Sequence, residues 1–375
     1  MSFRSFNPTP RTLMGPGPSD VHPRVLAAMS KPTIGHLDPE FSGLMDEIKA
    51  LLRYAFQTEN NLTLPLSAPG SAGMEAAFAN LLEPGDKVIV CINGVFGMRM
   101  AENVRRMGGD LVTVEDDWGN AVTPQKLRDA LQANPDAKIV AFVHAETSTG
   151  VCSDVEALCR IAKEFGCLTI VDAVTALAGI PLKVDEWQAD VVYSGTQKCL
   201  SCPPGISLIT FSHQAAERIR SRNQAVQSWF LDVSLLMDYW DGEGGRTYHH
   251  TAPVNAMYGL HEALLMVHEE GLENAWARHA AMHEHLVASL EPLGINFVVD
   301  SDIRLPQLNL VSVPDGVVEA EVRTQLLQEY NLEIGAGLGA FAGKVWRIGL
   351  MGHAARSENV VLCANAMRDV LGKQS

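Results

Sequence analysis

The sequence predicts an α/β protein whose larger part is a mostly parallel sheet covered by helices, followed by a smaller α+β part. Short runs rich in valine and isoleucine alternate along the chain with segments whose apolar residues recur at helical spacing. The chain has 375 residues, of which 47% are hydrophobic and 19% charged. This is enough material for a large core, and it exceeds what one core usually supports, so we expect two domains.

Four runs are typical of buried strands, because each is apolar, rich in β-branched residues and ends at a polar residue or a glycine. They are residues 86–94, 137–146, 167–174 and 189–195. Between them lie two helical segments, residues 123–135 and 154–166, and Gly166 suits the end of the second helix. Strands alternating with helices favour parallel pairing, and ligands of such sheets bind beyond the carboxyl ends of the strands.

The pattern changes near residue 271, where a second region begins. Its expected elements are a long helix (272–294), two strands (295–300 and 305–314), a helix (319–331), a strand (344–352) and a helix capped by Ser357 (357–373). We therefore expect an N-terminal arm (1–14), a large domain (15–270) and a small C-terminal domain (271–375).

The charge balance and the cysteines limit partners and location. The chain carries 44 acidic against 29 basic residues and a formal charge of −15, which argues against nucleic acid and anionic membranes as partners. No run approaches the roughly 18 apolar residues of a membrane span, and the first residues lack the apolar core of a secretion signal. Seven scattered cysteines indicate free thiols in a reducing compartment. We expect a cytoplasmic protein.

Polar residues follow the predicted strands. They are Glu146, Thr147 and Ser148 after the second run, Asp172 in the third, and Gln197 and Lys198 after the fourth. Upstream, Gly70 and Ser71 precede an alanine-rich helical segment, whose free N–H groups and dipole would favour a phosphate. One edge of the sheet would therefore offer an anion cradle, a carboxylate and an amine.

Pyridoxal 5′-phosphate is a cofactor that needs all three groups. Its aldehyde needs a lysine amine, its pyridine nitrogen needs a carboxylate that keeps it protonated, and its phosphate needs backbone donors. Lys198, Asp172 and the turn at Gly70 and Ser71 supply these groups. Taken singly, the lysine could be a solvated charge and the aspartate a helix cap, so the hypothesis depends on their joint occurrence.

A metal site is the other chemistry to consider, since Cys199 and Cys202 form a C-x-x-C pair. Structural zinc normally takes four cysteine or histidine ligands, and no second pair lies at suitable spacing nearby. The adjacent His249 and His250 would point in different directions. The remaining candidates, His279, His283 and His285, fit a solvated helix face. We expect no metal.

The sequence also resembles a known family, the class V aminotransferases of fold type I, and within it the alanine–glyoxylate and serine–glyoxylate (serine–pyruvate) group. The resemblance runs through LMGPGPSDVHPRVLAAM, LEPGDKVIVCINGVFGMR, ETSTGV, IVDAV, YSGTQKCLSCPPGISL, YHHTAPV and GKVWRIGLMG. It implies a fold-type I pyridoxal-phosphate transferase with a mostly parallel seven-stranded sheet. It also implies a homodimer whose active sites lie at the subunit interface.

The resemblance also implies a role for individual residues. Lys198 corresponds to the lysine that forms the Schiff base, Asp172 to the partner of the pyridine nitrogen and Arg347 to the arginine that binds the substrate carboxylate. The other correspondences are Thr147 beside the ring oxygen, Phe96 stacked on the ring, Gly70, Ser71 and Gln197 at the phosphate, Tyr248 and Thr251 reaching it from the neighbouring subunit, and Gly35 and His36 near the substrate pocket.

The implied activity is transfer of an amino group from alanine or serine to glyoxylate by a ping-pong mechanism, giving glycine and pyruvate or hydroxypyruvate. One alternative is a related class V enzyme with another small substrate pair. A second is a cysteine desulfurase-like lyase, which is disfavoured because Gln197 stands where such enzymes typically have histidine and Cys363 lies in a helical pattern.

Overall fold

The computed structural model describes residues 3–241 and 246–373. The first two positions of the expected N-terminal arm and the last two of the expected C-terminal domain lie outside the described residues.

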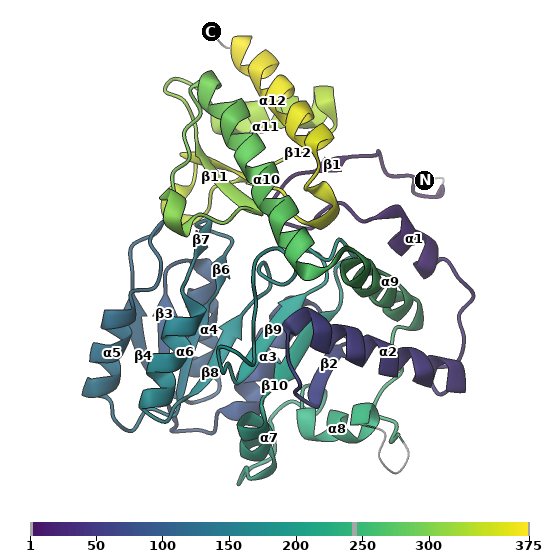
Figure 1. The fold of residues 1–375 in the computed structure, drawn as a ribbon, viewed down its shortest axis with the longest axis vertical. Helices are drawn as coiled ribbons and strands as arrows, with labels where there is room; N and C mark the ends of the chain where they lie inside the picture. The colour runs from purple at the N-terminus through teal and green to yellow at the C-terminus, as the bar shows by residue number, and fades with distance from the viewer. Residues whose placement is uncertain (1–2, 242–245, 374–375) are drawn as a thin grey trace.

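The larger part of the molecule is built on a seven-stranded sheet (Figure 1). Its strands, in spatial order, are β2 (Leu62–Leu66), β10 (Ser207–Phe211), β9 (Val191–Gly195), β8 (Leu168–Asp172), β5 (Ile139–Val143), β3 (Lys87–Ile92) and β4 (Asp110–Glu115). Only β10 runs against the others, since it pairs antiparallel with both β2 and β9. Four of these strands are buried along their whole length, as a sheet covered on both faces requires. The predicted mostly parallel seven-stranded sheet is confirmed.

Helices follow the strands along the chain. They are α1 (Pro23–Met29), α2 (Pro39–Phe56), α3 (Gly70–Leu81), α4 (Val95–Arg106), α5 (Pro124–Ala133), α6 (Val155–Glu164), α7 (His213–Arg220), α8 (Val233–Asp241), α9 (Val254–Glu270), α10 (Leu272–Leu290), α11 (Glu319–Tyr330) and α12 (Ser357–Gly372). Helix α3 contacts β8, β9 and β10, and α4 contacts β3, β4 and β5. Because α3 and α4 begin shortly after β2 and β3 end, their N-termini lie at the carboxyl ends of these strands.

The C-terminal elements lie together above the sheet in Figure 1. They include a three-stranded antiparallel sheet in the order β11 (Leu308–Ser312), β14 (Val345–Gly349) and β13 (Gly335–Ala336). The N-terminal strand β1 (Thr12–Leu13) pairs with β12 (Leu332–Glu333), which brings the start of the chain to this region. Short 3₁₀ helices complete it: η1 (Glu291–Leu293), η2 (Ser301–Ile303), η3 (Gly339–Phe341) and η4 (Gly352–Ala354).

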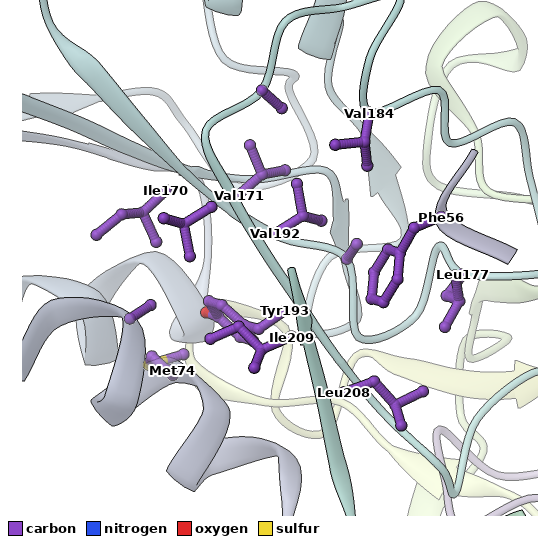
Figure 2. Packing of buried hydrophobic residues seen from close by; sticks show 14 of the residues in the cluster. Phe56, Met74, Ile170, Val171, Leu177, Val184, Val192, Tyr193, Leu208 and Ile209 are labelled. Atoms are coloured by element: carbon purple, nitrogen blue, oxygen red, sulfur yellow. The ribbon is translucent and has the colours of Figure 1, made fainter. Parts of the chain in front are cut away.

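Separate hydrophobic cores support the two regions. The larger one fills both faces of the seven-stranded sheet, and Figure 2 shows Val171 and Val192 from adjacent strands on the side of Val184, with Met74 of α3 beside Tyr193 on the other side. A second core gathers side chains of α10, α11, α12 and the C-terminal strands around the fully buried Trp346. Gly271, with a φ of 83°, joins α9 to α10 at the expected boundary. The division into domains stays a prediction.

Three details of the predicted elements are wrong. The run 137–146 is not one strand, because β5 ends at Val143 and β6 (Ala145–Glu146) pairs instead with β7 (Val151–Cys152). Residues 295–300 form no strand, since their regular pairing with β11 is limited to one bridge between Phe297 and Val311. Ser357 is the first residue of α12, and Arg356 occupies the cap position without a side-chain hydrogen bond. In contrast, Gly166, with a φ of 72°, ends α6 as predicted.

Candidate active site

Four buried ionisable groups meet at the carboxyl ends of the parallel strands, and we call them the strand-end cluster: Lys198, Asp172, Glu146 and Arg347. Asp172 is the last residue of β8, Lys198 follows β9 and Glu146 ends β6. Arg347 comes from β14 of the C-terminal region. The charges of the other three all act on Lys198, which shows that the predicted gathering of polar groups at this edge occurs.

Lys198 is held in a dry environment by the N-terminal part of the chain. Its side chain is buried, with the residue 8% exposed, and Nζ donates a hydrogen bond to the carbonyl of Pro16. Burial first, and then the charge of Arg347, lowers the pKa of the lysine to about 8. Gly17 has a φ of 110°, and a Cβ there would lie 2.6 Å from Nζ, so only glycine fits. The lysine is therefore an amine that loses its proton readily and can attack an aldehyde.

Asp172 accepts one hydrogen bond at each carboxylate oxygen. The Val174 N–H donates to Oδ1 at 2.9 Å and the Tyr193 hydroxyl donates to Oδ2 at 2.8 Å. Burial raises the pKa of the carboxyl to about 6, and the two donors and the charge of Lys198 oppose that rise. The group is an oriented carboxylate at neutral pH, which suits a protonated pyridine nitrogen.

Glu146 joins the site to the start of helix α4. Its carboxylate accepts hydrogen bonds from the Phe96 N–H at 3.1 Å and from the Ser148 N–H and hydroxyl at 3.0 and 2.6 Å. The Ser148 hydroxyl in turn accepts one from the Val95 N–H at 2.9 Å. Burial raises the pKa of Glu146, although these donors favour its ionised form. Glu146 and Ser148 thus bind the first free N–H groups of α4. They therefore set the position of Phe96, the residue expected to stack on the cofactor ring.

Arg347 is anchored by two backbone carbonyls. Its Nε donates to Ala336 O at 2.7 Å and its Nη1 to Thr147 O at 3.2 Å. Burial lowers the pKa of the guanidinium to about 10, so the side chain keeps its charge at neutral pH. The structure therefore places the backbone of Thr147 against Arg347, and the expected roles of the Thr147 hydroxyl and of Arg347 stay predictions.

The expected phosphate end lies at the N-terminus of α3. Pro69 occupies the cap position and makes no side-chain cap hydrogen bond, and Gly70 is the first helical residue. A Cβ on Gly70 would lie 3.6 Å from Val174 and 3.7 Å from Gly195, so the turn packs directly on the ends of β8 and β9. The side-chain oxygen of Gln197 is buried there without a partner. A buried amine, an oriented carboxylate and this helix N-terminus fit pyridoxal phosphate.

Four of the expected site residues lie apart from the strand-end cluster. Tyr248 is 56% exposed, its hydroxyl lies 3.3 Å from the Thr251 hydroxyl, and its ring centroid lies 5.3 Å from that of His36. Gly35 is exposed beside His36. Within residues 3–241 and 246–373, the structure shows no hydrogen bond or ion pair between these residues and the cluster. Their expected roles stay predictions.

Several predictions about histidines are wrong. His279 is fully buried, its Nδ1 lies 2.6 Å from Ala275 O, and its Nε2 accepts the Gly352 N–H at 2.9 Å. His283 is buried against Asn309, with 2.6 Å between Nδ1 and Oδ1. Both rings have polar partners inside the fold, so the prediction that these histidines lie on a solvated helix face is wrong. His249 and His250 do not point apart, since their Nδ1 atoms lie 2.9 Å from each other.

The cysteines and the helices of the described residues show neither a metal site nor a membrane span. All seven cysteines are free thiols, and burial raises the pKa of Cys199 and of Cys202 to about 12. In the part of the chain that the structure describes, no three histidine, cysteine or acidic side chains are arranged to hold a metal ion. None of the helices in that part is both long and apolar enough to cross a membrane.

Sequence reasoning missed three contributors to the site. Tyr193 lies inside an apolar run. It could have been found from the sequence, because a hydroxyl in a buried strand needs a polar partner nearby. Glu146 was noted only as a strand-end residue, without a role. Gly17, in the GPGP stretch, becomes a site residue only because the chain start folds over Lys198.

The mostly parallel sheet and the lysine and carboxylate at its edge define a class, the pyridoxal-phosphate enzymes of fold type I. The chain belongs to the aminotransferase class-V family, whose sequence profile matches residues 13–360. It is thus a pyridoxal-phosphate-dependent aminotransferase, and the lyase alternative is not favoured.

Similar proteins support this assignment over nearly the whole chain. Alanine–glyoxylate aminotransferase of Rattus norvegicus is 42% identical, over 96% of this chain and 87% of its own length. (S)-Ureidoglycine–glyoxylate transaminase of Bacillus subtilis is 38% identical, over 99% and 93%. The crystal structure of alanine–glyoxylate aminotransferase from Nostoc sp. superposes with a TM-score of 0.97 at 46% identity, covering 99% of this chain and 98% of that one.

Proposed function

We propose that this aminotransferase moves an amino group from alanine or serine to glyoxylate, giving glycine and pyruvate or hydroxypyruvate. The observation that carries the proposal is that similar proteins with different donors, alanine and (S)-ureidoglycine, are both named for glyoxylate. Among the described residues, Arg347 is the only buried arginine, so the strand-end cluster offers one guanidinium for a substrate carboxylate. A donor with a second carboxylate would lack a partner there, so aspartate and glutamate should be poor donors.

We assign a task to three of the four residues of the strand-end cluster. When bound, pyridoxal phosphate supplies an aldehyde for the lysine amine and a ring that accepts electrons. Arg347 binds the substrate carboxylate, for which a guanidinium fork is suited. Asp172 holds the proton on the ring nitrogen. Lys198 Nζ takes the proton from the substrate Cα, which its low pKa favours. The two half-reactions share one site in turn, so ping-pong kinetics are expected.

A panel of amino donors against glyoxylate, pyruvate and 2-oxoglutarate tests the substrate pair. Glycine should form from glyoxylate with alanine or serine at the highest kcat/KM. (S)-Ureidoglycine belongs in the panel because of the Bacillus subtilis relative, and a preference for it would replace the proposed donor while keeping the acceptor. A clear preference for 2-oxoglutarate would overturn the proposal and leave the cofactor site intact.

We also propose that the enzyme is a homodimer with active sites at the subunit interface, in which Tyr248 and Thr251 reach the cofactor phosphate of the other subunit. The support is that Tyr248 is large, aromatic and 56% exposed, and that its hydroxyl contacts Thr251 and not the strand-end cluster. Mixed dimers of Lys198→Ala and Tyr248→Ala/Thr251→Ala subunits should be more active than either parent, because one site is then intact. Absence of any gain in proven mixed dimers would contradict the proposal.

We propose a cytoplasmic location, and the seven free cysteines support it, since thiols of this kind persist in a reducing compartment. Fractionation of the source cells with an antibody against the protein would test it, and recovery in an oxidising compartment would contradict it.

A further inference from the structure

Tyr193 is the best-defined polar group near the site that the proposed mechanism does not use. It lies in β9, is fully buried, and pairs in register with Asp172 of the parallel neighbour β8. Paired residues of adjacent strands project to the same face of a sheet. Figure 2 shows the ring of Tyr193 among the core side chains, near Met74 of α3 and Ile209 of β10. The ring is therefore fixed by packing, and the only freedom left to its hydroxyl is the direction of its proton.

The Tyr193 hydroxyl completes the fixation of the Asp172 carboxylate. The Val174 N–H at 2.9 Å holds Oδ1, and a single bond at one oxygen still allows the carboxylate to rotate. The second bond, from Tyr193 to Oδ2 at 2.8 Å, fixes its plane. Hydrogen bonds to an ionised oxygen are about twice as strong as neutral ones. Each oxygen also keeps acceptor capacity, because one donor occupies only part of it.

The charges around Asp172 give the hydroxyl a second effect. Burial and the nearby Glu146 carboxylate disfavour the ionised form of Asp172, while Lys198, Val174 N–H and Tyr193 favour it. Burial and the neighbouring Asp172 also raise the pKa of Tyr193 well above its usual value, so the phenol stays protonated and can only donate to the carboxylate. Removing the hydroxyl would make the carboxylate more basic and draw the proton away from the ring nitrogen.

We propose that Tyr193 is a positioning residue that orients Asp172 and keeps it ionised against the cofactor ring nitrogen, without touching the cofactor itself. The role is exerted through Asp172 alone. It follows that loss of the hydroxyl lowers kcat and leaves substrate binding by Arg347 unaffected.

The test is Tyr193→Phe, which removes one oxygen and keeps the buried ring. Tyr239→Phe is the matched control, because Tyr239 is also buried, at 1% exposure, and its hydroxyl has no partner. For Tyr193→Phe we expect kcat to fall about 10-fold, the scale of one charge-assisted hydrogen bond, with both KM values within about twofold. The control should keep the parent values. Equal kcat values for the two variants would overturn the proposal.

Two further measurements separate positioning from a structural role. In the protein without cofactor, the titration midpoint of Asp172, followed by carbon NMR of labelled aspartate, should move upward in Tyr193→Phe and stay in Tyr239→Phe. In the Asp172→Asn background, Tyr193→Phe should change kcat by less than about twofold, because the group through which it acts is gone. An unmoved midpoint, or a full 10-fold loss in the Asn background, would each contradict the proposal.

If Tyr193→Phe folds poorly, 3-fluorotyrosine at position 193 keeps the shape and makes the phenol a stronger donor. The Asp172 midpoint should then move downward. An upward shift or none would refute the role of the hydroxyl.

Discussion

The strand-end cluster and the exposed group formed by Gly35, His36, Tyr248 and Thr251 differ in how they are built. Every member of the cluster is buried, and each has a partner from the same chain, such as Pro16 for Lys198 and Ala336 for Arg347. In the exposed group, Tyr248 contacts Thr251 and the half-buried His36, while the Gly35 carbonyl accepts the Asp38 N–H. A buried charge needs its partners inside the fold, whereas an exposed residue needs none. The difference supports the proposals that one chain supplies the chemical groups and that a second subunit completes the margin of the site.

The largest effect should come from Lys198→Ala. Because Lys198 is the buried amine of the cluster, we expect the variant to lose its covalent link to the cofactor and nearly all turnover while it stays folded. Borohydride reduction of the parent with cofactor bound, followed by peptide mapping, should label Lys198. The exposed Lys126, changed to alanine, is the control and should leave activity unchanged. Labelling at another lysine would show that the cluster is misassigned.

Asp172→Asn should have the next largest effect. The amide cannot hold a proton on the ring nitrogen, so proton removal from the substrate should slow by a factor of about 100 or more, the range of a general acid–base contribution. The cofactor should still bind, because Lys198 and the N-terminus of α3 are unchanged. Single-turnover absorbance measurements separate the two steps, and near-normal turnover would mean that another group serves the nitrogen.

Arg347→Lys should reduce kcat/KM. The loss of transition-state stabilisation should be about 1.5–3 kcal/mol, the scale of a hydrogen bond to a charged group. Lysine keeps the charge and loses the planar fork, and it cannot keep both bonds to Ala336 O and Thr147 O. Steady-state kinetics with alanine and glyoxylate measure the loss. Unchanged KM values for both substrates would show that Arg347 is not the carboxylate anchor.

The pH dependence of stability tests the burial of Lys198 directly. The pKa of this lysine is lowered from 10.5 to about 8 on folding, so between these values the unfolded chain holds a proton that the folded protein has lost. Its free energy of unfolding should therefore rise with pH in this window, relative to Lys198→Met. The gain should be on the order of 1–3 kcal/mol, and below pH 8 the penalty is fully present. Denaturant titrations of both cofactor-free proteins measure it, and a flat difference would mean that the amine is solvated.

The smallest effect should come from Tyr248→Phe. The tyrosine is more than half exposed and its hydroxyl has one long contact, so the free energy of unfolding of a single subunit should change by less than about 0.5 kcal/mol. Under the dimer proposal, cofactor affinity should still fall a few-fold, because a hydrogen bond to the phosphate is lost. Equilibrium dialysis of the cofactor measures this affinity. An unchanged affinity would show that Tyr248 does not bind the cofactor phosphate.

Much of the fold follows from local pattern. Apolar β-branched runs predicted the positions of β3, β8 and β9 because these strands are buried on both faces and have no polar side to disguise them. The pattern failed at residues 295–300, whose apolar and β-branched residues suit a strand but whose ladder with β11 is reduced to one bridge. It also failed for His279. The sequence does not distinguish a buried histidine of a helix from a solvated one, because the partner that allows its burial, the Gly352 N–H, lies far away in the chain.

The sequence by itself determined which residue types stand at the strand ends, and hence Lys198 and Asp172 as an amine and a carboxylate at one edge. Only the tertiary structure decided how these groups behave. The pKa of Lys198 falls because the fold buries the amine and brings the charge of Arg347 close to it, and Asp172 is oriented because β9 aligns Tyr193 with it. Burial, desolvation and hydrogen-bond direction depend on contacts between residues far apart in the chain, and local sequence does not encode them.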